Sequence, residues 1–495
     1  MPTATLQISD EVNVKIQGLE LADRKALQKM FEYEVPGARY LPSVRLGRWS
    51  GKKSFFSLGG TSYVNLIEEI VPAIVGAGYQ ISLEDLRDYN TSFTFAEVDK
   101  DTFNHRVWGK GHRLEGQPIE LRDYQVQIIN KSLSNTQSVQ EVATGAGKTL
   151  VTAALSSHVE QYGRSIVIVP NKGLVIQTED DYLNLGLDVG VYFGDRKEYN
   201  KTHTICTWQS LNNLFKASKT GEIDFTIADF LDGVVCIMVD EVHMAKADVM
   251  TALLTGPFAK VPIRWGLTGT IPKPKYEATA IVVSIGPVIH KLGAAELQEK
   301  GVLAQCHVNV VQLQDEADFS TYQSELKHLL EDKKRLDKMA ELINEIRKSG
   351  NTLVLVDRIA AGEALQTRLS GIFNLLKDAP DVAFVSGGTK LSERKEEYDE
   401  IATSTGKVII ATYGVAAVGI NLPRIFNLVL VEPGKSFVRV IQSIGRGIRK
   451  ADDKDHVMIW DITSSCRFSK RHLTQRKTFY KEASYPFSIE KLHYK

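Results

Sequence analysis

The chain has 495 residues, and its 60 basic and 60 acidic side chains give a formal net charge of zero at pH 7. Hydrophobic residues make up 43% and charged residues 24%, which excludes a largely disordered or collagen-like chain. This length leaves room for roughly three domains. Because the net charge is zero, a polyanionic ligand has to be bound by local clusters of basic residues.

The cysteines and the apolar stretches indicate the compartment. The cysteines lack C-x-x-C spacing and a nearby pair of histidines, which argues against a disulfide framework and a zinc site. They are Cys206, Cys236, Cys306 and Cys466. The first residues lack a basic segment followed by an apolar one, and the longest apolar stretch, Ala280 to Ile289, is too short to span a membrane. We therefore expect a cytosolic protein that is neither exported nor bound to a membrane.

The pattern along the chain predicts a small domain followed by two larger ones. Residues 1–100 form short segments rich in Ser, Gly, Pro and aromatic residues, which indicates a small α+β domain. Short β-branched runs then alternate with helical stretches, as in parallel α/β sheets, and predict α/β domains over 101–290 and 291–495. The expected strands are 139–143, 166–170, 204–207, 234–239 and 264–267, then 353–356, 382–385, 408–411, 428–431 and 457–461. The expected helices are 148–161, 362–369, 391–403 and 437–445, with an amphipathic surface helix over 325–348.

In the small domain, residues 36–55 carry five cations and no acidic residue. The cations are Arg39, Arg45, Arg48, Lys52 and Lys53. Five cations without a counter-charge predict a nucleic-acid site in a neutral protein. Trp49 lies among them and is a candidate to stack on an unpaired base, although its alternative role is in the core of the small domain.

The segment VATGAGKT at residues 142–149 follows a predicted strand and opens a predicted helix. In this context backbone N–H groups and the positive end of a helix surround phosphate oxygens. The residues expected around a bound nucleotide here are Thr144, Gly145, Ala146, Gly147, Lys148 and Thr149. Lys148 is expected to contact the β and γ phosphates and Thr149 to bind Mg²⁺. Val142 occupies the place of the first glycine in the strict phosphate-loop pattern.

A second signal is the apolar run 234–239, which ends in Asp240 and Glu241. Carboxylates at the carboxyl end of a parallel strand face the ligand crevice. Asp240 is therefore expected to hold Mg²⁺ through water, and Glu241 to deprotonate the attacking water. The third signal is QSIGRGIR, in which Gln442, Arg446 and Arg449 share one helix face and suit a triphosphate. We expect ATP to be clamped between the phosphate loop and these arginines, which lie in different predicted domains.

Six motifs in this order resemble those of superfamily 2 helicases and translocases, whose fold is two tandem RecA-like domains. LRDYQ at 121–125 resembles the adenine-reading segment, with Gln125 as base reader and Tyr124 as stacking partner. VATGAGKT, DEVH at 240–243 and LTGT at 267–270 resemble motifs I to III. The stretch 411–422 resembles motif V, which assigns Thr412 to nucleic acid and Gly419 to nucleotide, and QSIGRGIR resembles motif VI. The family places further nucleic-acid contacts at Asn171, Lys172, Trp208 and Gln209.

The DEVH tetrad, the Gln at the start of motif VI and the stretch YLPSVRLGRWSGK at 40–52 resemble the UvsW-like phage recombination helicases. This resemblance implies an ATP- and Mg²⁺-dependent DNA helicase that unwinds or branch-migrates Holliday junctions, forks and R-loops, in a bacterial or phage-infected cytosol. It implies branched duplexes and RNA–DNA hybrids as ligands, and single-strand-binding or recombination proteins as candidate partners. The alternatives are the motor subunit of a restriction system and a nucleotide-gated nucleic-acid-binding protein without productive hydrolysis.

Overall fold

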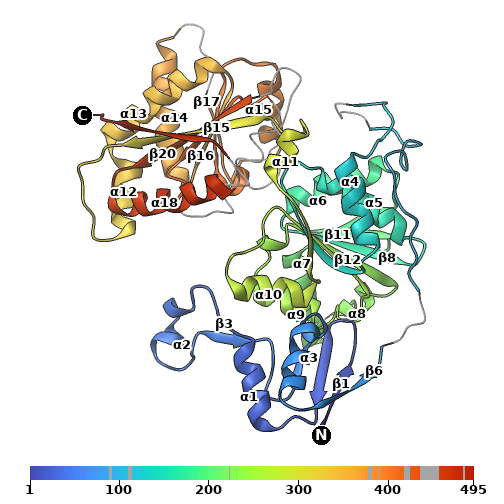
Figure 1. Ribbon diagram of the computed structural model, residues 1–495. Coiled ribbons are helices and arrows are strands. Elements are labelled where there is room, and N and C mark those ends of the chain that lie inside the picture. Colours follow the sequence, from blue (N-terminus) through green and yellow to red (C-terminus); the bar gives the residue numbers. More distant parts are fainter. Residues whose placement is uncertain are drawn as a thin grey trace. The chain divides into compact units, whose positions relative to one another are not determined.

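The structure, a computed structural model, describes residues 1–87, 92–109, 114–221, 223–376, 382–389, 391–416, 424–434, 456–482 and 485–494. The chain forms two units, each with a parallel sheet flanked by helices (Figure 1). The first unit comprises Met1–Val142 and Gly147–Lys291, and the second comprises Ala143–Ala146 and Leu292–Lys495. This architecture confirms the predicted fold class of two tandem α/β domains after an α+β segment. No helix in the described part of the chain is long and apolar enough to cross a membrane.

The first unit begins with a four-stranded sheet in the order β5-β2-β1-β6. Its strands are β1 (Thr3–Ile8), β2 (Asn13–Gln17), β5 (Thr61–Tyr63) and β6 (Gln80–Asp85), and its helices are α1 (Leu21–Met30) and α3 (Ile67–Gly76). Alternate residues of β1 are buried, because one face of the sheet packs on the helices. A two-stranded ribbon of β3 (Glu32–Glu34) and β4 (Lys52–Ser54) carries the short helix α2 (Pro42–Arg45) between its strands.

This α+β segment packs against the first parallel sheet and its helices. The backbone N–H of Glu11 donates to the carbonyl of Ala259 at 3.1 Å. Asn13 Nδ2 donates to the carbonyl of Thr255 at 2.9 Å. The ring of Phe55 stacks on Tyr276 with 5.4 Å between centroids. The α+β segment and the first parallel sheet therefore belong to one compact unit.

The first parallel sheet has the order β10-β9-β11-β8-β12-β13-β7-β14. Its strands are β7 (Gln137–Val142), β8 (Arg164–Val169), β9 (Val189–Phe193), β10 (Arg196–Lys197), β11 (His203–Thr207), β12 (Val234–Asp240), β13 (Ile263–Thr268) and β14 (Val288–Leu292). Its helices are α4 (Asp123–Leu133), α5 (Lys148–Val159), α6 (Lys172–Asn184), α7 (Trp208–Thr220), α8 (Ile227–Phe230), α9 (Ala247–Leu254) and α10 (Lys275–Ser284). The central strands β8 and β12 each contain a continuous apolar run, 166–169 and 234–239, because helices cover both faces of the sheet.

The second parallel sheet has the order β17-β18-β16-β19-β20-β15-β21. Its strands are β15 (Gln305–Leu313), β16 (Thr352–Val356), β17 (Val382–Val385), β18 (Val408–Thr412), β19 (Asn427–Val431), β20 (His456–Ser464) and β21 (Phe487–Leu492). Its helices are α11 (Ala294–Glu299), α12 (Tyr322–Glu331), α13 (Lys333–Ile346), α14 (Ile359–Asn374), α15 (Leu391–Thr403), α16 (Tyr413–Ala416) and α18 (Arg467–Glu482).

The two sheets have the same strand order once the short edge strand β10 is set aside. Numbered along the chain from β7 and from β15, both read 3-4-2-5-6-1-7. β12 in the first sheet therefore corresponds to β19 in the second, and β7 corresponds to β15. The sequences of the two halves have only a coarse similarity. Their shared strand order is visible only in the tertiary structure.

The sequence prediction missed strands in both sheets and joined two helices. The missed strands are β9, β10, β14, β15 and β21. β15 and β21 alternate apolar with polar residues and lack the continuous apolar run of a central strand. The helix expected over 325–348 is α12 followed by α13, because the Asp332 carboxylate accepts the N–H of Arg335 at 2.9 Å and starts a new helix. The helix expected over 437–445 lies outside the described residues.

Candidate nucleotide and nucleic-acid sites

Five neighbouring parallel strands of the first sheet end at one edge, and predicted functional residues follow each of them. In the sheet these strands lie in the order β11-β8-β12-β13-β7. Trp208 follows β11, Asn171 lies two residues beyond β8, and Asp240 ends β12. The LTGT segment ends β13, and the phosphate-loop segment follows β7. The topology thus gathers residues that are far apart in sequence at the edge where ligands of α/β sheets bind.

The centre of the site is a buried ion pair between the phosphate-loop lysine and the second carboxylate of DEVH. Lys148 Nζ lies 3.1 Å from Glu241 Oε1. The same ammonium donates to the carbonyl of Val142 at 3.3 Å. Both side chains of the ion pair are buried. Val142, which replaces the first glycine of the strict pattern, is also buried and supplies a backbone acceptor to the lysine.

Glu241 is held in an unusual backbone conformation. Its φ of 49° lies in the left-handed region, which costs a non-glycine residue about 1–2 kcal/mol. The backbone N–H of Glu241 donates to Asp240 Oδ1 at 2.9 Å and so ties the two carboxylate residues together. Strain of this kind persists where the surroundings fix it, as in ligand sites. The turn directs the Glu241 carboxylate toward Lys148.

The LTGT segment at residues 267–270 supplies further polar contacts around Glu241. The N–H of Gly269 donates to Glu241 Oε2 at 3.2 Å. His243 Nδ1 lies 3.4 Å from Glu241 Oε2 and 2.6 Å from Thr268 Oγ1. Burial alone would raise the pKa of Glu241, but Lys148, His243 and the Gly269 hydrogen bond outweigh it, so the pKa lies below its ordinary value. Glu241 is therefore an ionised carboxylate at neutral pH, with Lys148 as its counter-ion.

The phosphate-loop segment has the backbone geometry of an anion site. Gly145 and Gly147 have φ of 92° and 81°, which a residue with a side chain rarely adopts. A Cβ at Gly147 would lie 2.6 Å from Gln125 Nε2, so the predicted base-reading glutamine lies directly against this loop. Thr144 Oγ1 is buried without a hydrogen-bond partner among the residues that the structure describes, and it is a donor available to a ligand. Thr149 is half-buried in the first turn of α5, the position expected of a metal ligand.

Two aromatic residues with predicted ligand contacts are buried in the structure. Tyr124 was assigned to stack on adenine, but its side chain is only 3% exposed and its hydroxyl accepts from Arg122 Nη1 at 2.9 Å. Trp208 was assigned to nucleic acid, but it is 9% exposed and belongs to the apolar core of the first unit. Both rings are in the first turns of their helices, α4 and α7, and lie among the buried residues of those helices.

The other predicted nucleic-acid contacts near this edge have mixed environments. Asn171 is the N-cap of α6, and its Oδ1 accepts the N–H of Leu174 at 3.0 Å. Lys172 and Gln209 are exposed in the first turns of α6 and α7. In the second unit, Thr412 ends β18 and is half-buried. Lys172 and Gln209 therefore keep their side chains available to a ligand, whereas Asn171 has a capping role that the residue type already favours.

The cationic cluster of the small domain is smaller than its sequence suggests. Lys53 Nζ lies 2.7 Å from Asp248 on α9, and Lys52 Nζ lies 3.6 Å from Glu32. The prediction that all five cations lack a counter-charge is therefore wrong for these two, because the fold brings carboxylates from distant positions to them. Arg45 and Arg48 are exposed and form no ion pair within the described chain.

The aromatic residue that faces solvent in this cluster is Tyr40. Its side chain is 68% exposed, and the Arg39 guanidinium lies over its ring at 4.7 Å. Trp49 is half-buried and its Nε1 donates to the carbonyl of Lys52 at 3.0 Å. Among the described residues, Trp49 is not part of the apolar core cluster of this unit, and its two predicted roles stay predictions. Leu41 and Leu46 are also exposed beside Arg39 and Arg45.

Some predicted site residues lie outside the described part of the chain. They are Gly419, Gln442, Arg446 and Arg449. Their roles stay predictions from the sequence. The described residues on either side of the 435–455 segment are the end of β19 with Glu432 to Gly434, and the start of β20.

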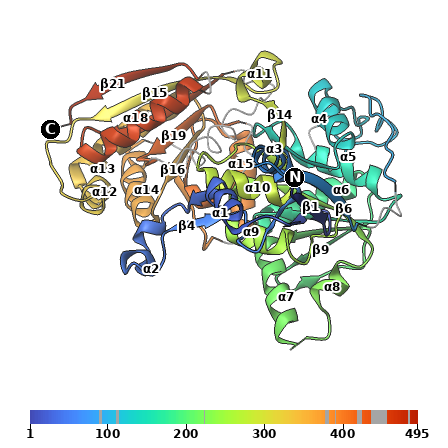
Figure 2. The same ribbon diagram turned by 60° about the horizontal axis from the view of Figure 1, so that its bottom comes forward.

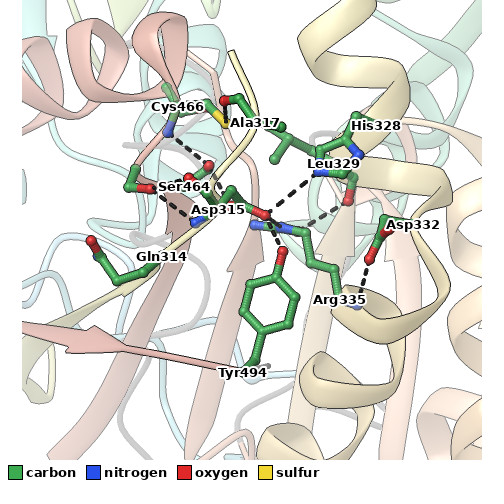
Figure 3. Close-up of polar contacts among 12 residues, drawn as sticks. Gln314, Asp315, Ala317, His328, Leu329, Asp332, Arg335, Ser464, Cys466 and Tyr494 are labelled. Carbon is green, nitrogen blue, oxygen red and sulfur yellow. Dashed lines mark hydrogen bonds and ion pairs between the residues drawn. The ribbon is translucent and has the colours of Figure 1, made fainter. Parts of the chain in front are cut away.

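Sequence reasoning missed a buried polar cluster in the second unit. Glu432 directly follows β19, the counterpart of β12, and its φ of 42° is left-handed like that of Glu241. Arg335 Nη2 donates to Glu432 Oε1 at 2.5 Å. Arg335 also lies 3.5 Å from Asp315, which accepts hydrogen bonds from Ser464 and Tyr494 (Figure 3). An arginine and a glutamate thus pair at the place where the first sheet has Lys148 and Glu241.

Comparison with known proteins identifies both domains. Residues 118–273 match the family of type III restriction enzyme res subunits, and residues 334–451 match the helicase conserved C-terminal domain. The chain is 24% identical to the ATP-dependent DNA helicase uvsW of Enterobacteria phage T4 over 92% of this chain and 89% of that protein. It is 25% identical to the DNA 3'-5' helicase XPB of Kineococcus radiotolerans over 74% of this chain and 64% of that protein.

Among solved structures, the fragment of a putative HsdR subunit of a type I restriction enzyme from Vibrio vulnificus YJ016 has a TM-score of 0.56. It is 18% identical and covers 80% of this chain and 72% of that chain, a likeness that concerns the fold alone. A res-subunit domain followed by a helicase C-terminal domain, and similarity along nearly the whole chain to an ATP-dependent DNA helicase, show that this protein is an ATP-dependent helicase.

Proposed function

We propose that this helicase is a DNA motor that couples ATP hydrolysis to the unwinding or branch migration of forks, Holliday junctions and R-loops in recombination, repair and replication restart. The observation that carries the ATPase is the buried pair of Lys148 and Glu241 beside Asp240. The similarity to the phage T4 DNA helicase along 92% of the chain supports DNA as the nucleic acid.

The ion pair between Lys148 and Glu241 suggests how ATP binding activates the site for hydrolysis. Lys148 exchanges Glu241 for the β and γ phosphate oxygens of ATP, which frees the carboxylate to orient and deprotonate the attacking water. The low pKa of Glu241 depends on the charge of Lys148, so its basicity rises when the lysine turns to phosphate. Thr149 and Asp240 are the residues that would hold Mg²⁺, which neutralises phosphate charge. Arg446 and Arg449 supply the guanidinium groups for the charge that develops on the triphosphate.

The small domain contributes to substrate choice. Arg39, Arg45 and Arg48 supply phosphate contacts, and the Tyr40 ring offers a face to an unpaired base at a junction. Lys172, Gln209 and Thr412 contact the backbone of the tracked strand. Candidate protein partners are single-strand-binding and recombination proteins.

One comparison tests this function. ATP hydrolysis is measured without nucleic acid and with single-stranded DNA, duplex, fork, Holliday junction, R-loop and RNA at equal phosphate concentration. We expect forks and junctions to stimulate hydrolysis most, and strand displacement to accompany it. Stimulation by RNA alone, or no stimulation by any of these ligands, would contradict a DNA motor.

The match of residues 118–273 to type III restriction res subunits favours a second candidate, the motor of a restriction system. Such a motor consumes ATP on linear duplex as fast as on forks and acts with a nuclease partner. Equal rates on these two ligands, together with co-purification of a nuclease, would support it over the first.

A further inference from the structure

The outer face of α18 in the second unit is a row of cations. Five basic residues of α18 lie on one side of the helix, because at 3.6 residues per turn their positions fall within about 120° of arc. The cations of this face are Arg467, Lys470, Arg471, Lys477 and Lys481. Four of them are exposed and Lys477 is half-buried. Between Arg467 and Lys481 the helix has no acidic residue.

The opposite face of α18 is anchored in the buried core. Arg476 donates to both carboxylate oxygens of Asp461 on β20, at 2.8 and 2.9 Å, and Tyr480 donates to the same carboxylate at 2.8 Å. At the start of the helix, the N–H groups of Phe468 and Ser469 donate to the buried Glu325 carboxylate of α12. Figures 1 and 2 both show α18 beside α12 in the second unit. The row of cations is therefore displayed on a rigid element.

Three lysines on or beside other helices of this unit are paired with glutamates. On α12 and α13, Lys327 lies 3.9 Å from Glu331 and Lys338 lies 3.0 Å from Glu341, and Lys348 after α13 lies 2.7 Å from Glu345. On α18, none of the five outer cations forms an ion pair within the described chain. In a protein with zero net charge, five cations without an ion pair in the described part of the chain give this helix face a local positive field.

We propose that the outer face of α18 binds the phosphate backbone of a DNA arm. Arg467 and Lys481 are 14 residues apart, which is about 21 Å along a helix and comparable to about six base pairs of duplex. The exposed cations of this face are long and flexible, and the half-buried ring of Phe468 lies under Arg467 and Arg471 at 5.8 and 6.0 Å, so the contact is to backbone and independent of sequence. This proposal rests on the proposed function, since it adds a second DNA contact to a DNA motor.

The test is the salt dependence of DNA binding by full-length protein. Fluorescence anisotropy with a forked DNA gives the dissociation constant at a series of salt concentrations for wild type and the triple variant Arg467→Gln, Lys470→Gln, Arg471→Gln. Each lost phosphate contact lowers the slope of log K against log salt by about 0.7–0.9, so we expect a total decrease of about 2–3. ATP hydrolysis without DNA should be unchanged, because the cations of this face are outside the nucleotide site.

Two matched variants separate this effect from a general loss of charge or fold. The variant Lys327→Gln, Lys338→Gln, Lys348→Gln removes three cations of the same unit that are already paired with glutamates, and should keep the wild-type slope. The variant Arg467→Lys, Arg471→Lys keeps the charges and should also keep the slope. An α18 triple variant with the slope of these controls would overturn the proposal, as would an α18 face that binds only an acidic protein. A wild type that neither binds the fork nor hydrolyses ATP faster with it would instead contradict the proposed function.

Discussion

At the scale of single residues, Lys148 and Glu241 neutralise each other in a place that largely excludes water. A buried charge is tolerated only with a partner, so the pair holds both side chains ready beside the phosphate loop. Removing either residue therefore does more than delete one function, because it leaves the other charge buried alone.

Glu241→Gln and Lys148→Ala should stop turnover for different reasons. Glu241→Gln keeps the shape and the hydrogen bond from Gly269 but lacks a base, so ATP should bind normally while hydrolysis falls by about 10²–10⁴. Lys148→Ala removes the phosphate cation, so ATP binding itself should weaken. Equilibrium binding of a labelled nucleotide and a phosphate-release assay distinguish the two. Hydrolysis by Glu241→Gln within about tenfold of wild type would exclude Glu241 as the base.

Glu432 should make stability depend on pH. Burial raises its pKa from 4.5 to about 7, with Asp315 and Asp461 adding to the shift and Arg335 and Arg476 opposing it. Because the folded-state pKa is above the unfolded one, this group stabilises the fold fully below pH 4.5, and the contribution is lost as pH rises toward about 7.

Glu432→Gln replaces the carboxyl with an amide that does not titrate, so the variant should lack this decrease of stability with rising pH. The free energy of unfolding, measured by urea denaturation, should fall from about pH 5 to about pH 7 in wild type relative to Glu432→Gln, and the difference should be constant above that range. A wild-type curve parallel to that of the variant across the whole range would show that Glu432 is ionised with its ordinary pKa.

At the scale of elements, a single arginine caps the C-terminal ends of two helices of the first unit. Arg264 on β13 is fully buried and donates five hydrogen bonds to backbone carbonyls. Two of the acceptors, Leu254 and Ser284, are the last residues of α9 and α10. A cation at two helix C-termini satisfies carbonyls that have no partner within the helices and complements both helix dipoles.

Arg264→Met should destabilise the first unit by at least about 3 kcal/mol, because several buried carbonyls lose a charged donor. Arg264→Lys keeps the charge but has fewer donors in a less extended geometry, so its loss should be smaller. Urea denaturation of both variants measures the difference. Equal stability of wild type and Arg264→Met would mean that water or other donors satisfy these carbonyls.

The two parallel sheets also belong to this scale. Their identical strand order places Glu432 after β19 as Glu241 is placed after β12, with a cation opposite each. In the first sheet the cation is the first residue of the helix after a glycine-rich loop, and in the second it is a guanidinium with carboxylates on both sides. The same turn therefore serves a ligand site in one domain and a buried contact between arginine and glutamate in the other.

At the scale of the whole molecule, the small domain is part of the first unit, and its exposed ribbon carries the arginines proposed to bind DNA. Lys53 and Asp248 link this ribbon to α9, and Phe55 stacks on Tyr276 of α10. These contacts thus connect α2 and the residues beside it, which are proposed to bind DNA, to the helices of the first parallel sheet.

The triple variant Arg39→Ala, Arg45→Ala, Arg48→Ala should bind forked DNA more weakly and lower the salt slope by about 2–3, with unstimulated ATP hydrolysis intact. Lys53→Ala is the matched control, because its charge is already paired at 2.7 Å and its loss releases few counterions. Tyr40→Ala should weaken binding to forks by about 1–3 kcal/mol and to plain duplex much less. Anisotropy titrations measure all three, and an unchanged slope in the arginine variant would show that this face does not bind DNA.

The sequence alone determined the elements whose signal is local. The apolar runs of β8 and β12 predict central strands because both of their faces are buried. The GAGKT and DEVH motifs predict a nucleotide site because a phosphate-binding loop and a pair of carboxylates at a strand end are each built from a few neighbouring residues. The strands β15 and β21, which are neighbours at one side of the second sheet, were missed, since their polar residues alternate with apolar ones and resemble exposed segments.

Only the tertiary structure decided which charges meet and which rings are buried. Lys53 is paired with a carboxylate 195 residues away, and Arg335 with one 97 residues away. Tyr124 and Trp208 are excluded from solvent by helix packing, although their motifs assign them to ligands. Sequence patterns give residue types and spacing, whereas desolvation and Coulomb energy depend on distances between segments that are remote in the chain.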